Sequence, residues 1–221
     1  MNYSGAQVDQ ALSCAAVGGP VALRAGLPVT TSGMSLDRQC SSGLMTIATA
    51  AKQVVIDRMD VVAAGGQESI SLVQTKDMRM APDKSLMAMH KAIYMPMLQT
   101  AETVAKRYNV SRDAQDEYAF QSQMRTAAAQ AAGKFDDEIV PVTTTMNVMD
   151  KETKEVSQVE FTLTKDEGNR PETTLEGLQS LNPVMGPGMT ITAGNASQLS
   201  DGASACVLMD SQEAERLGLQ P

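Results

Sequence analysis

The residue best suited to chemistry is Cys40, which stands in residues 37–43 with the sequence DRQCSSG. An Ala-rich stretch with a helical pattern, residues 41–57, follows at once, so we expect the sulfur at the N-terminus of a helix. Unpaired N–H groups and the positive end of the helix dipole stabilise a thiolate, which is the nucleophilic form of cysteine. Two interpretations stay open from these residues alone: a nucleophile for a carbonyl carbon, or a buried and inert cysteine.

Three predicted elements would position this cysteine. Residues 29–37 are rich in small and β-branched types, which favours a short strand. Residues 59–66 are an apolar run closed by two glycines, which predicts a buried strand that leads into a tight turn. With the helix between them, residues 29–66 indicate a right-handed βαβ unit with parallel strands. Ligands of such sheets bind at the carboxyl ends of the strands, where this helix would begin.

The remaining chain has a different character, because residues 69–190 are more polar and richer in methionine. Ser111 is a candidate N-cap for one of its helices. The expected elements are a helix at 8–25 that is broken near residues 18–20, helices at 99–109 and 111–132, two strands around a charged turn within 138–165, a loop at 166–188, and a strand at the end of 190–210.

Composition excludes several classes of protein. The 221 residues are 43% apolar and 20% charged, with a net charge of −8 and no basic stripe of the kind that nucleic-acid binding needs. Three cysteines at these spacings match no zinc or disulfide pattern. The first residues do not resemble a signal peptide, and no apolar run approaches the ~20 residues of a membrane span. We therefore expect a cytoplasmic protein that binds neither nucleic acid nor membrane.

Three motifs in a fixed order carry a resemblance to a known family. They are DRQCSSGLMTIATA followed by VVAAGGQESIS, the long helical segment that begins TAETVAKRYNVSRDAQDEYAF, and ITAGNASQLSDGASACVLM. Together they resemble the amino-terminal half of thiolases. The resemblance implies an α/β fold with a βαβ-rich mixed sheet. Residues 1–68 and 191–221 would form a discontinuous core that lacks the family's first strand and helix, and residues 69–190 an inserted α+β loop domain.

The resemblance also implies roles for individual residues. Cys40 matches the cysteine that becomes acylated. Contacts with coenzyme A would come from Met97 in the acyl and pantetheine pocket, Ser197 on the pantetheine, Ala193 and Leu199 on either side of it, Arg170 near the adenosine end, and Leu181 beside that end. For Arg170, a solvated loop charge is an equally simple interpretation. Some family members have glycine after the matched serine, where this chain has Gln198.

The activity implied is acyl transfer between coenzyme A thioesters through a cysteine thioester, with coenzyme A as a substrate and no metal or redox cofactor. Thiolases take their base from a Gly-His-Pro motif in a carboxyl-terminal domain, which also carries an Asn-Glu-Ala-Phe motif and a second catalytic cysteine. None of these motifs occurs here, and the only histidine is His90. We therefore expect a truncated form that is inactive alone and that forms a homo-oligomer or joins a partner chain.

Other interpretations are a decarboxylating ketoacyl synthase, a non-catalytic acyl-CoA or lipid-binding module, and one subunit of a split thiolase. The helix that begins TAETVAKRY argues against the synthase. The missing histidine supports the binding module, whereas the complete DRQCSSG segment speaks against it.

Overall fold

The computed structural model describes residues 18–73 and 81–220, and the contacts between residues divide the chain into two units. Unit 1 contains Met1–Ala81 and Leu199–Pro221, and unit 2 contains Pro82–Gln198. Each unit is described by itself below. The domain boundaries at residues 68 and 191, which follow from the resemblance, stay a prediction.

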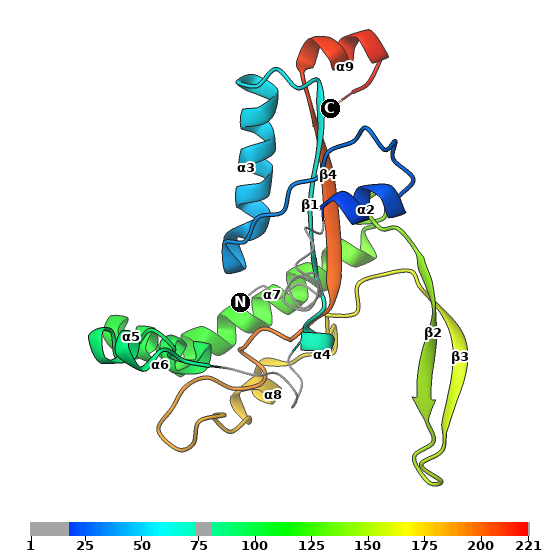
Figure 1. The fold of residues 1–221 in the computed structure, drawn as a ribbon. Helices are drawn as coiled ribbons and strands as arrows, with labels where there is room; N and C mark the ends of the chain where they lie inside the picture. The colour runs from blue at the N-terminus through cyan, green and yellow to red at the C-terminus, as the bar shows by residue number, and fades with distance from the viewer. Residues whose placement is uncertain (1–17, 74–80, 221) are drawn as a thin grey trace. The chain divides into compact units, whose positions relative to one another are not determined.

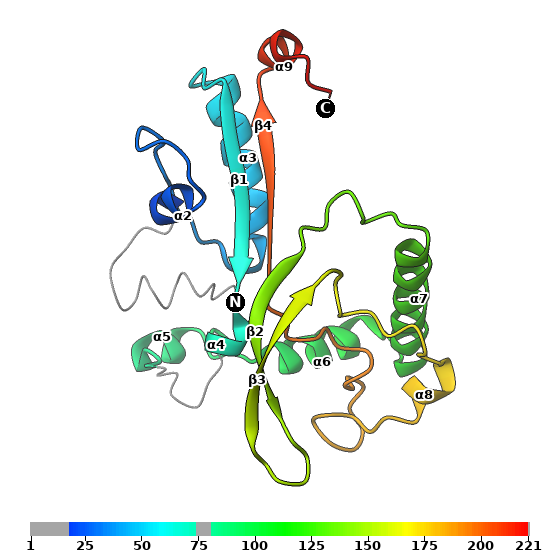
Figure 2. The ribbon, with the colours of Figure 1, turned by 90° about the vertical axis from the view of Figure 1, so that its right-hand side faces the viewer.

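Unit 1 is built around a two-stranded antiparallel sheet. Its strands pair over their full length, with Val61 opposite Met209 and Glu68 opposite Gly202. One helix, α3, lies along this pair of strands (Figure 1, Figure 2). The elements are α2 (Gly18–Arg24), the short 3₁₀ helix η1 (Gln39–Ser41), α3 (Ser42–Val55), β1 (Val61–Glu68), α4 (Ile70–Val73), β4 (Gly202–Met209) and α9 (Ser211–Leu217).

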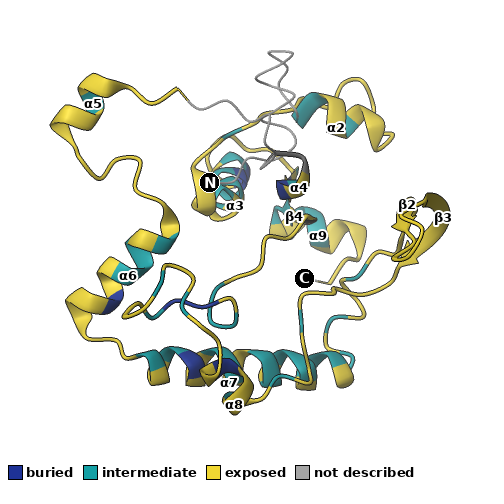
Figure 3. Ribbon diagram, turned by 90° about the horizontal axis from the view of Figure 1, so that it is seen from below, coloured by how far each residue is buried: buried dark blue, intermediate teal, exposed yellow. Residues whose placement is uncertain are grey.

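Three buried side chains of unit 1 lie where α3 meets the sheet, and Ile70 of α4 is buried as well. Ala50 and Val54 of α3 and Ala64 of β1 are buried, as Figure 3 shows by colour for the helix. These positions are small because the helix rests directly on the strand backbone. The prediction of a helix after Cys40 is therefore confirmed, and so is a strand after that helix.

Two details of the predicted βαβ unit are wrong. Residues 29–37 form no strand, and β1 pairs antiparallel with β4. A strand needs a ladder partner as well as suitable residues, and residues 33–34 instead lie against the start of α2. There a Cβ on Gly33 would come within 2.1 Å of the Gly19 nitrogen, so only glycine fits this crossing of two backbones.

The predicted burial of the second strand is also wrong. Within β1 only Ala64 is buried, and the two glycines lie inside the strand instead of closing it. Gly65 stands opposite Ala205, and a Cβ there would meet the Ser204 carbonyl oxygen at 2.8 Å. The glycine run therefore permits close pairing with β4.

Unit 2 combines helices with a separate hairpin. Its elements are α5 (Lys84–Met89), α6 (Met97–Tyr108), α7 (Arg112–Ala131), β2 (Val142–Met149), β3 (Val156–Leu163) and α8 (Leu175–Gln179). Ser111 caps α7 as predicted, accepting a hydrogen bond of 3.2 Å from the Ala114 N–H. The hairpin is also confirmed, with Val142 opposite Leu163. Figure 2 shows its two strands side by side.

One short helix lies in the segment predicted as a loop. Thr174 caps α8 by accepting a hydrogen bond of 3.0 Å from the Gly177 N–H, and Leu178 is buried against the rest of unit 2. Five residues are too few for a helical repeat of apolar positions to show in a sequence. Across the two described stretches of the chain, no helix has the length and apolar character needed to cross a bilayer.

Candidate functional site

The segment that carries Cys40 is a tight turn at the entrance to α3. Cys40 is the middle residue of η1, which leads without a break into the first residue of α3. Its side chain is exposed. The sulfur therefore lies at the N-terminal end of a 14-residue helix, where backbone N–H groups favour a negative charge.

The turn is held by short-range hydrogen bonds. The Ser42 hydroxyl accepts from the Arg38 N–H at 2.8 Å and donates to the Gln39 carbonyl at 2.7 Å. The Ser41 hydroxyl donates to the Arg38 carbonyl at 3.0 Å, and the Gln39 N–H donates to the Asp37 carboxylate at 2.7 Å. All of these bonds join residues within four positions of each other, so the turn is a local structure.

Gln39, directly before the cysteine, has a left-handed backbone with a φ of 51°. Residues other than glycine adopt this conformation at a cost, and such residues concentrate where a side chain must be aimed. The three hydrogen bonds to Arg38 and Gln39 hold the strained residue in place. The chain therefore turns sharply before Cys40 and presents it at the helix entrance.

The acidic residues of unit 1 affect one another. Burial raises the pKa of Glu68, at the end of β1, and the carboxylates of Asp201 and Asp37 shift it in the same direction. Hydrogen bonds from the Ser71 hydroxyl and N–H lower the pKa of Asp201. Asp201 is thus held as a carboxylate at the start of α4, whereas Glu68 takes up a proton more readily than an ordinary glutamate.

The candidate site residues, which are Cys40 and the six predicted coenzyme A contacts, fall into two groups. Cys40 and Leu199 belong to unit 1, and the other five residues belong to unit 2. Met97 is the first residue of α6 and is 70% exposed. The remaining four, Arg170, Leu181, Ala193 and Ser197, are exposed residues of irregular segments outside the helices and strands.

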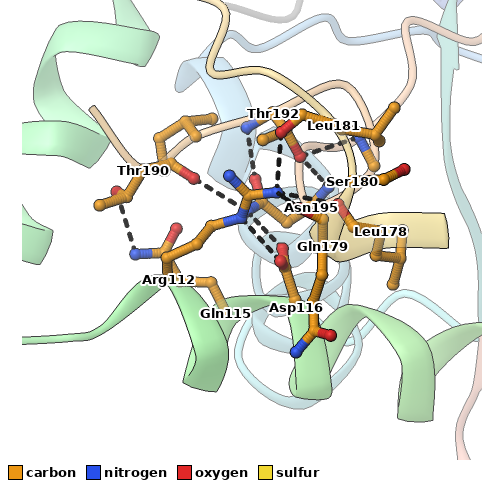
Figure 4. A network of polar contacts seen from close by, with 12 residues as sticks. Arg112, Gln115, Asp116, Leu178, Gln179, Ser180, Leu181, Thr190, Thr192 and Asn195 are labelled. Carbon is orange, nitrogen blue, oxygen red and sulfur yellow. Dashed lines mark hydrogen bonds and ion pairs between the residues drawn. The ribbon is translucent and has the colours of Figure 1, made fainter. Parts of the chain in front are cut away.

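A buried polar network fixes the segments that carry Leu181 and Ala193 (Figure 4). Arg112 of α7 donates to the Asp116 carboxylate at 2.7 Å and to the carbonyl oxygens of Leu178 and Leu181 at 2.8 and 3.0 Å. Asp116 is completely buried. The guanidinium thus donates to one carboxylate and to backbone carbonyls in the last turn of α8 and just after it.

Asn195 extends this network into the segment before Ser197. Its amide nitrogen donates to Asp116 at 3.0 Å and to the Thr190 carbonyl at 3.1 Å. Its amide oxygen accepts from the N–H of Thr192, a residue that is completely buried. One asparagine therefore folds residues 190–195 back on themselves and anchors them to α7.

Glu102 of α6 holds the same segment from a second helix. Its carboxylate accepts from the N–H groups of Thr190 and Ile191 at 2.8 and 2.7 Å, and from the Thr190 hydroxyl at 3.0 Å. Burial alone would raise the pKa of Glu102, but these three hydrogen bonds together lower it. Glu102 therefore acts as a charged anchor for the start of the segment.

The sequence did not predict the hydrogen bonds by which Arg112, Asp116 and Glu102 hold these segments. Arg112 and Asp116 are four residues apart on one helix, a spacing that signals a contact between them but not their further partners 66 to 79 positions away. His90, the only histidine, follows α5 as its C-cap in unit 2. Among the residues that the structure describes, no group of three or more His, Cys, Asp or Glu could hold a metal ion.

One known protein family matches almost the whole chain. The model of the thiolase N-terminal domain matches residues 3–212. The chain belongs to the thiolase family. The fold is accordingly the mixed α/β fold of a thiolase N-terminal domain.

Several relatives have high identity to this chain. A 3-ketoacyl-CoA thiolase of Bacillus subtilis is 44% identical over 197 residues, which are 89% of this chain and 50% of that protein. A human peroxisomal 3-ketoacyl-CoA thiolase is 43% identical over 195 residues, covering 87% and 45%. The chain thus spans about half the length of the relatives that it matches.

Solved structures agree with this match. Human mitochondrial 3-ketoacyl-CoA thiolase superposes with a TM-score of 0.73 at 34% identity, over 92% of this chain and 52% of that one. The same human enzyme has been solved in complex with CoA and gives a TM-score of 0.71.

Proposed function

We propose that this chain takes part in acyl transfer between coenzyme A thioesters, with Cys40 as the residue that carries the acyl group. The observation that supports this most directly is the exposed thiol of Cys40 in the turn before α3, in a chain that belongs to the thiolase family. The substrates would be 3-ketoacyl-CoA, acetyl-CoA and coenzyme A.

The first step would be attack of the Cys40 sulfur on a carbonyl carbon of the acyl donor, and a new carbon–sulfur bond forms. With acetyl-CoA as donor, the bond from the thioester carbonyl to the coenzyme A sulfur breaks, and coenzyme A leaves as its thiolate. With a 3-ketoacyl-CoA as donor, the sulfur attacks the 3-keto carbon, the bond between C2 and C3 breaks, and acetyl-CoA leaves as its enolate, which takes up a proton. Backbone N–H groups at the entrance of α3 would stabilise the oxyanion of the tetrahedral intermediate. In both cases the acyl group ends as a thioester of Cys40, so it stays activated for a second acceptor.

In the second step the acyl group would leave Cys40. Either coenzyme A attacks the acyl-enzyme, which completes cleavage of a 3-ketoacyl-CoA, or the enolate of acetyl-CoA attacks it, which forms acetoacetyl-CoA. Division of the transfer into two halves gives ping-pong kinetics.

Recognition of coenzyme A would fall to the other candidate residues. Ser197, with Ala193 and Leu199 around it, would contact the pantetheine, and Met97 would line the acyl end. Arg170 and Leu181 would lie toward the adenosine. The hydrogen bonds of Arg112, Asp116 and Glu102 support this role, because they fix the backbone that bears Leu181 and Ala193.

We further propose that the 221-residue chain does not complete this cycle by itself. A cysteine nucleophile in repeated turnover needs a base that accepts and returns protons. Histidine most often fills that role, and the only histidine here is His90 in unit 2. A histidine supplied by a further polypeptide segment would complete the site.

Incubation with acetyl-CoA tests the acylation step. Intact-mass and peptide mass spectrometry should find one acetyl group on Cys40 in the wild-type chain and in C206S, and none in C40S. Cys206 is the matched control, since it is also exposed but lies in β4. Binding of acetyl-CoA without acetylation would instead favour a non-catalytic acyl-CoA-binding module.

A thiolysis assay with acetoacetyl-CoA and coenzyme A tests the claim about turnover. We expect no sustained formation of acetyl-CoA by the 221-residue chain. A rate close to that of a full-length relative would overturn this part of the proposal.

A further inference from the structure

The loop of residues 166–170 is tethered by amide side chains. Gln130 of α7 donates to the Asp166 carbonyl at 3.1 Å, and Gln198 donates to the Gly168 carbonyl at 2.6 Å. Asn169 donates to the backbone carbonyl and side-chain oxygen of Gln123, at 2.9 and 2.8 Å. An irregular loop is therefore held from the long helix α7 on one side and from Gln198 on the other.

Arg170 ends this loop, and its backbone is fixed in both directions. Its N–H donates to the Gln123 side-chain oxygen at 2.8 Å. Its carbonyl accepts from the Thr173 N–H at 3.1 Å and from the Thr173 hydroxyl at 2.7 Å. The backbone from which this side chain extends is therefore set before any ligand arrives.

The guanidinium of Arg170 is used differently from that of Arg112. Arg112 spends its donors on Asp116 and on backbone carbonyls, and its side chain is 22% exposed. Arg170 is exposed, and its guanidinium has no hydrogen bond or ion pair to any residue in the described parts of the chain. It is thus a cation on a fixed backbone with its charge available to a ligand.

Gln198 connects this cation to the segment that bears Ser197. Gln198 directly follows Ser197 in the sequence. Its side-chain amide donates to the carbonyl of Gly168, which is two positions before Arg170. One hydrogen bond therefore fixes the spacing between the backbone at Ser197 and the backbone at Arg170. A glycine at position 198, as in some thiolases, has no side chain to make this bond.

We propose that Gln198 is a positioning residue for coenzyme A recognition. It holds Arg170 at the distance from Ser197 at which the guanidinium meets the phosphate groups of coenzyme A while Ser197 contacts the pantetheine. This inference rests on the proposed function of unit 2. Arginine suits the task because its planar fork binds phosphate oxygens through two hydrogen bonds.

Binding measurements on the 221-residue chain test this inference. Isothermal titration calorimetry with coenzyme A is compared with titration of pantetheine, which lacks the phosphates and the adenosine. We expect Q198A and Q198M to weaken coenzyme A binding about fivefold, and R170A about tenfold. Pantetheine binding should change less than about twofold, because Arg170 would not touch that ligand.

A double-mutant cycle then identifies the residue through which Gln198 acts. In the R170A background, Q198A should have almost no further effect on coenzyme A binding. Q198M keeps the length of the side chain without its donor, so it separates the hydrogen bond from packing. Q121A is the control, because the side-chain hydrogen bonds that the structure describes for Gln121 go to Glu117 and Arg125 on the same helix.

The possible failures are distinguishable. If the wild-type chain does not bind coenzyme A, the proposed recognition by unit 2 fails and this inference fails with it. If coenzyme A binds but Q198A weakens pantetheine equally, or its effect simply adds to that of R170A, only the positioning role is wrong. Thermal unfolding of each variant ensures that the comparison is made between folded proteins.

Discussion

Two irregular segments of this protein are held in place by opposite means. The turn at Cys40 is fixed by hydrogen bonds between residues no more than four positions apart. Residues 190–195 are fixed by Glu102 and Asp116, which are 79 to 89 positions away from the residues that they bond. The bonds described for the first segment are local, whereas the second segment depends on the packing of α6 and α7.

The difference teaches where each part of the site is vulnerable. Substitutions in the Cys40 turn should alter the presentation of the thiol at little cost in stability. Substitutions in the network on α6 and α7 should displace the segment that bears Ala193. They should also destabilise unit 2. The predictions below test this contrast, beginning with the largest expected effect.

D116A should have the largest effect on stability. Asp116 is completely buried and accepts from both Arg112 and Asn195. Its removal leaves a partly buried guanidinium without its carboxylate, a loss that typically costs about 3–5 kcal/mol. Urea unfolding followed by far-UV circular dichroism, which detects the long helix α7, measures this loss.

E117A is the control for D116A, since Glu117 is the next residue of α7 and is exposed. We expect a change within about 0.5 kcal/mol. Equal losses for the two variants would show that the buried network does not stabilise unit 2.

E102Q should have a smaller effect that depends on pH. The pKa of Glu102 is lowered in the folded protein, so its stabilisation is complete above the ordinary glutamate pKa. That stabilisation is lost as the pH falls below the ordinary glutamate pKa and through the lowered folded-state value. At pH 7 the variant should lose about 1.5–3 kcal/mol, because hydrogen bonds to a charged acceptor are replaced by bonds to a neutral amide.

Urea unfolding of wild type and E102Q at several pH values checks this sign. The difference between the two proteins should shrink steadily as the pH is lowered from 6 to about 3. A difference that stays constant over this range would show that the charge of Glu102 does not anchor residues 190–191.

S42A should have the smallest effect on stability but a larger effect on the reactivity of the Cys40 thiol. Ser42 joins Arg38 to Gln39 through two hydrogen bonds in an exposed turn, so its loss should cost about 1 kcal/mol or less. Because Gln39 is then released from its left-handed conformation, alkylation of Cys40 by iodoacetamide should become several-fold slower.

S41A is the matched control for S42A. Its hydroxyl makes one bond to the Arg38 carbonyl, and the Ser41 N–H also donates to that carbonyl. Its effect on the alkylation rate should therefore be smaller. A large loss of stability in S42A would mean that the turn depends on distant contacts after all.

The same contrast explains what could be predicted from the sequence. The helix after Cys40, the helices 111–132 and 99–109, the N-cap at Ser111 and the hairpin are confirmed in kind, because each is encoded by neighbouring residues. The strand at 29–37 and the parallel βαβ unit are wrong, because strand pairing depends on a distant partner: the residues of β1 pair with residues of β4 that are 134 to 148 positions away.

The residues of the candidate site also differ in how far the sequence could predict them. Cys40 could be singled out from its own segment, and the structure places it as an exposed residue at a helix entrance. The anchors Arg112, Asp116 and Glu102 could not, because nothing near them in sequence indicates that their distant partners lie in residues 178–195.

The most direct test of the central claim compares two exposed cysteines in one protein. The chain is treated with limiting iodoacetamide at pH 7, and peptide mass spectrometry follows modification of Cys40 and Cys206 over time. The helix entrance should make Cys40 react about tenfold faster than Cys206, which lies in a strand. Equal rates, or a faster Cys206, would contradict the account that this turn prepares Cys40 to accept an acyl group.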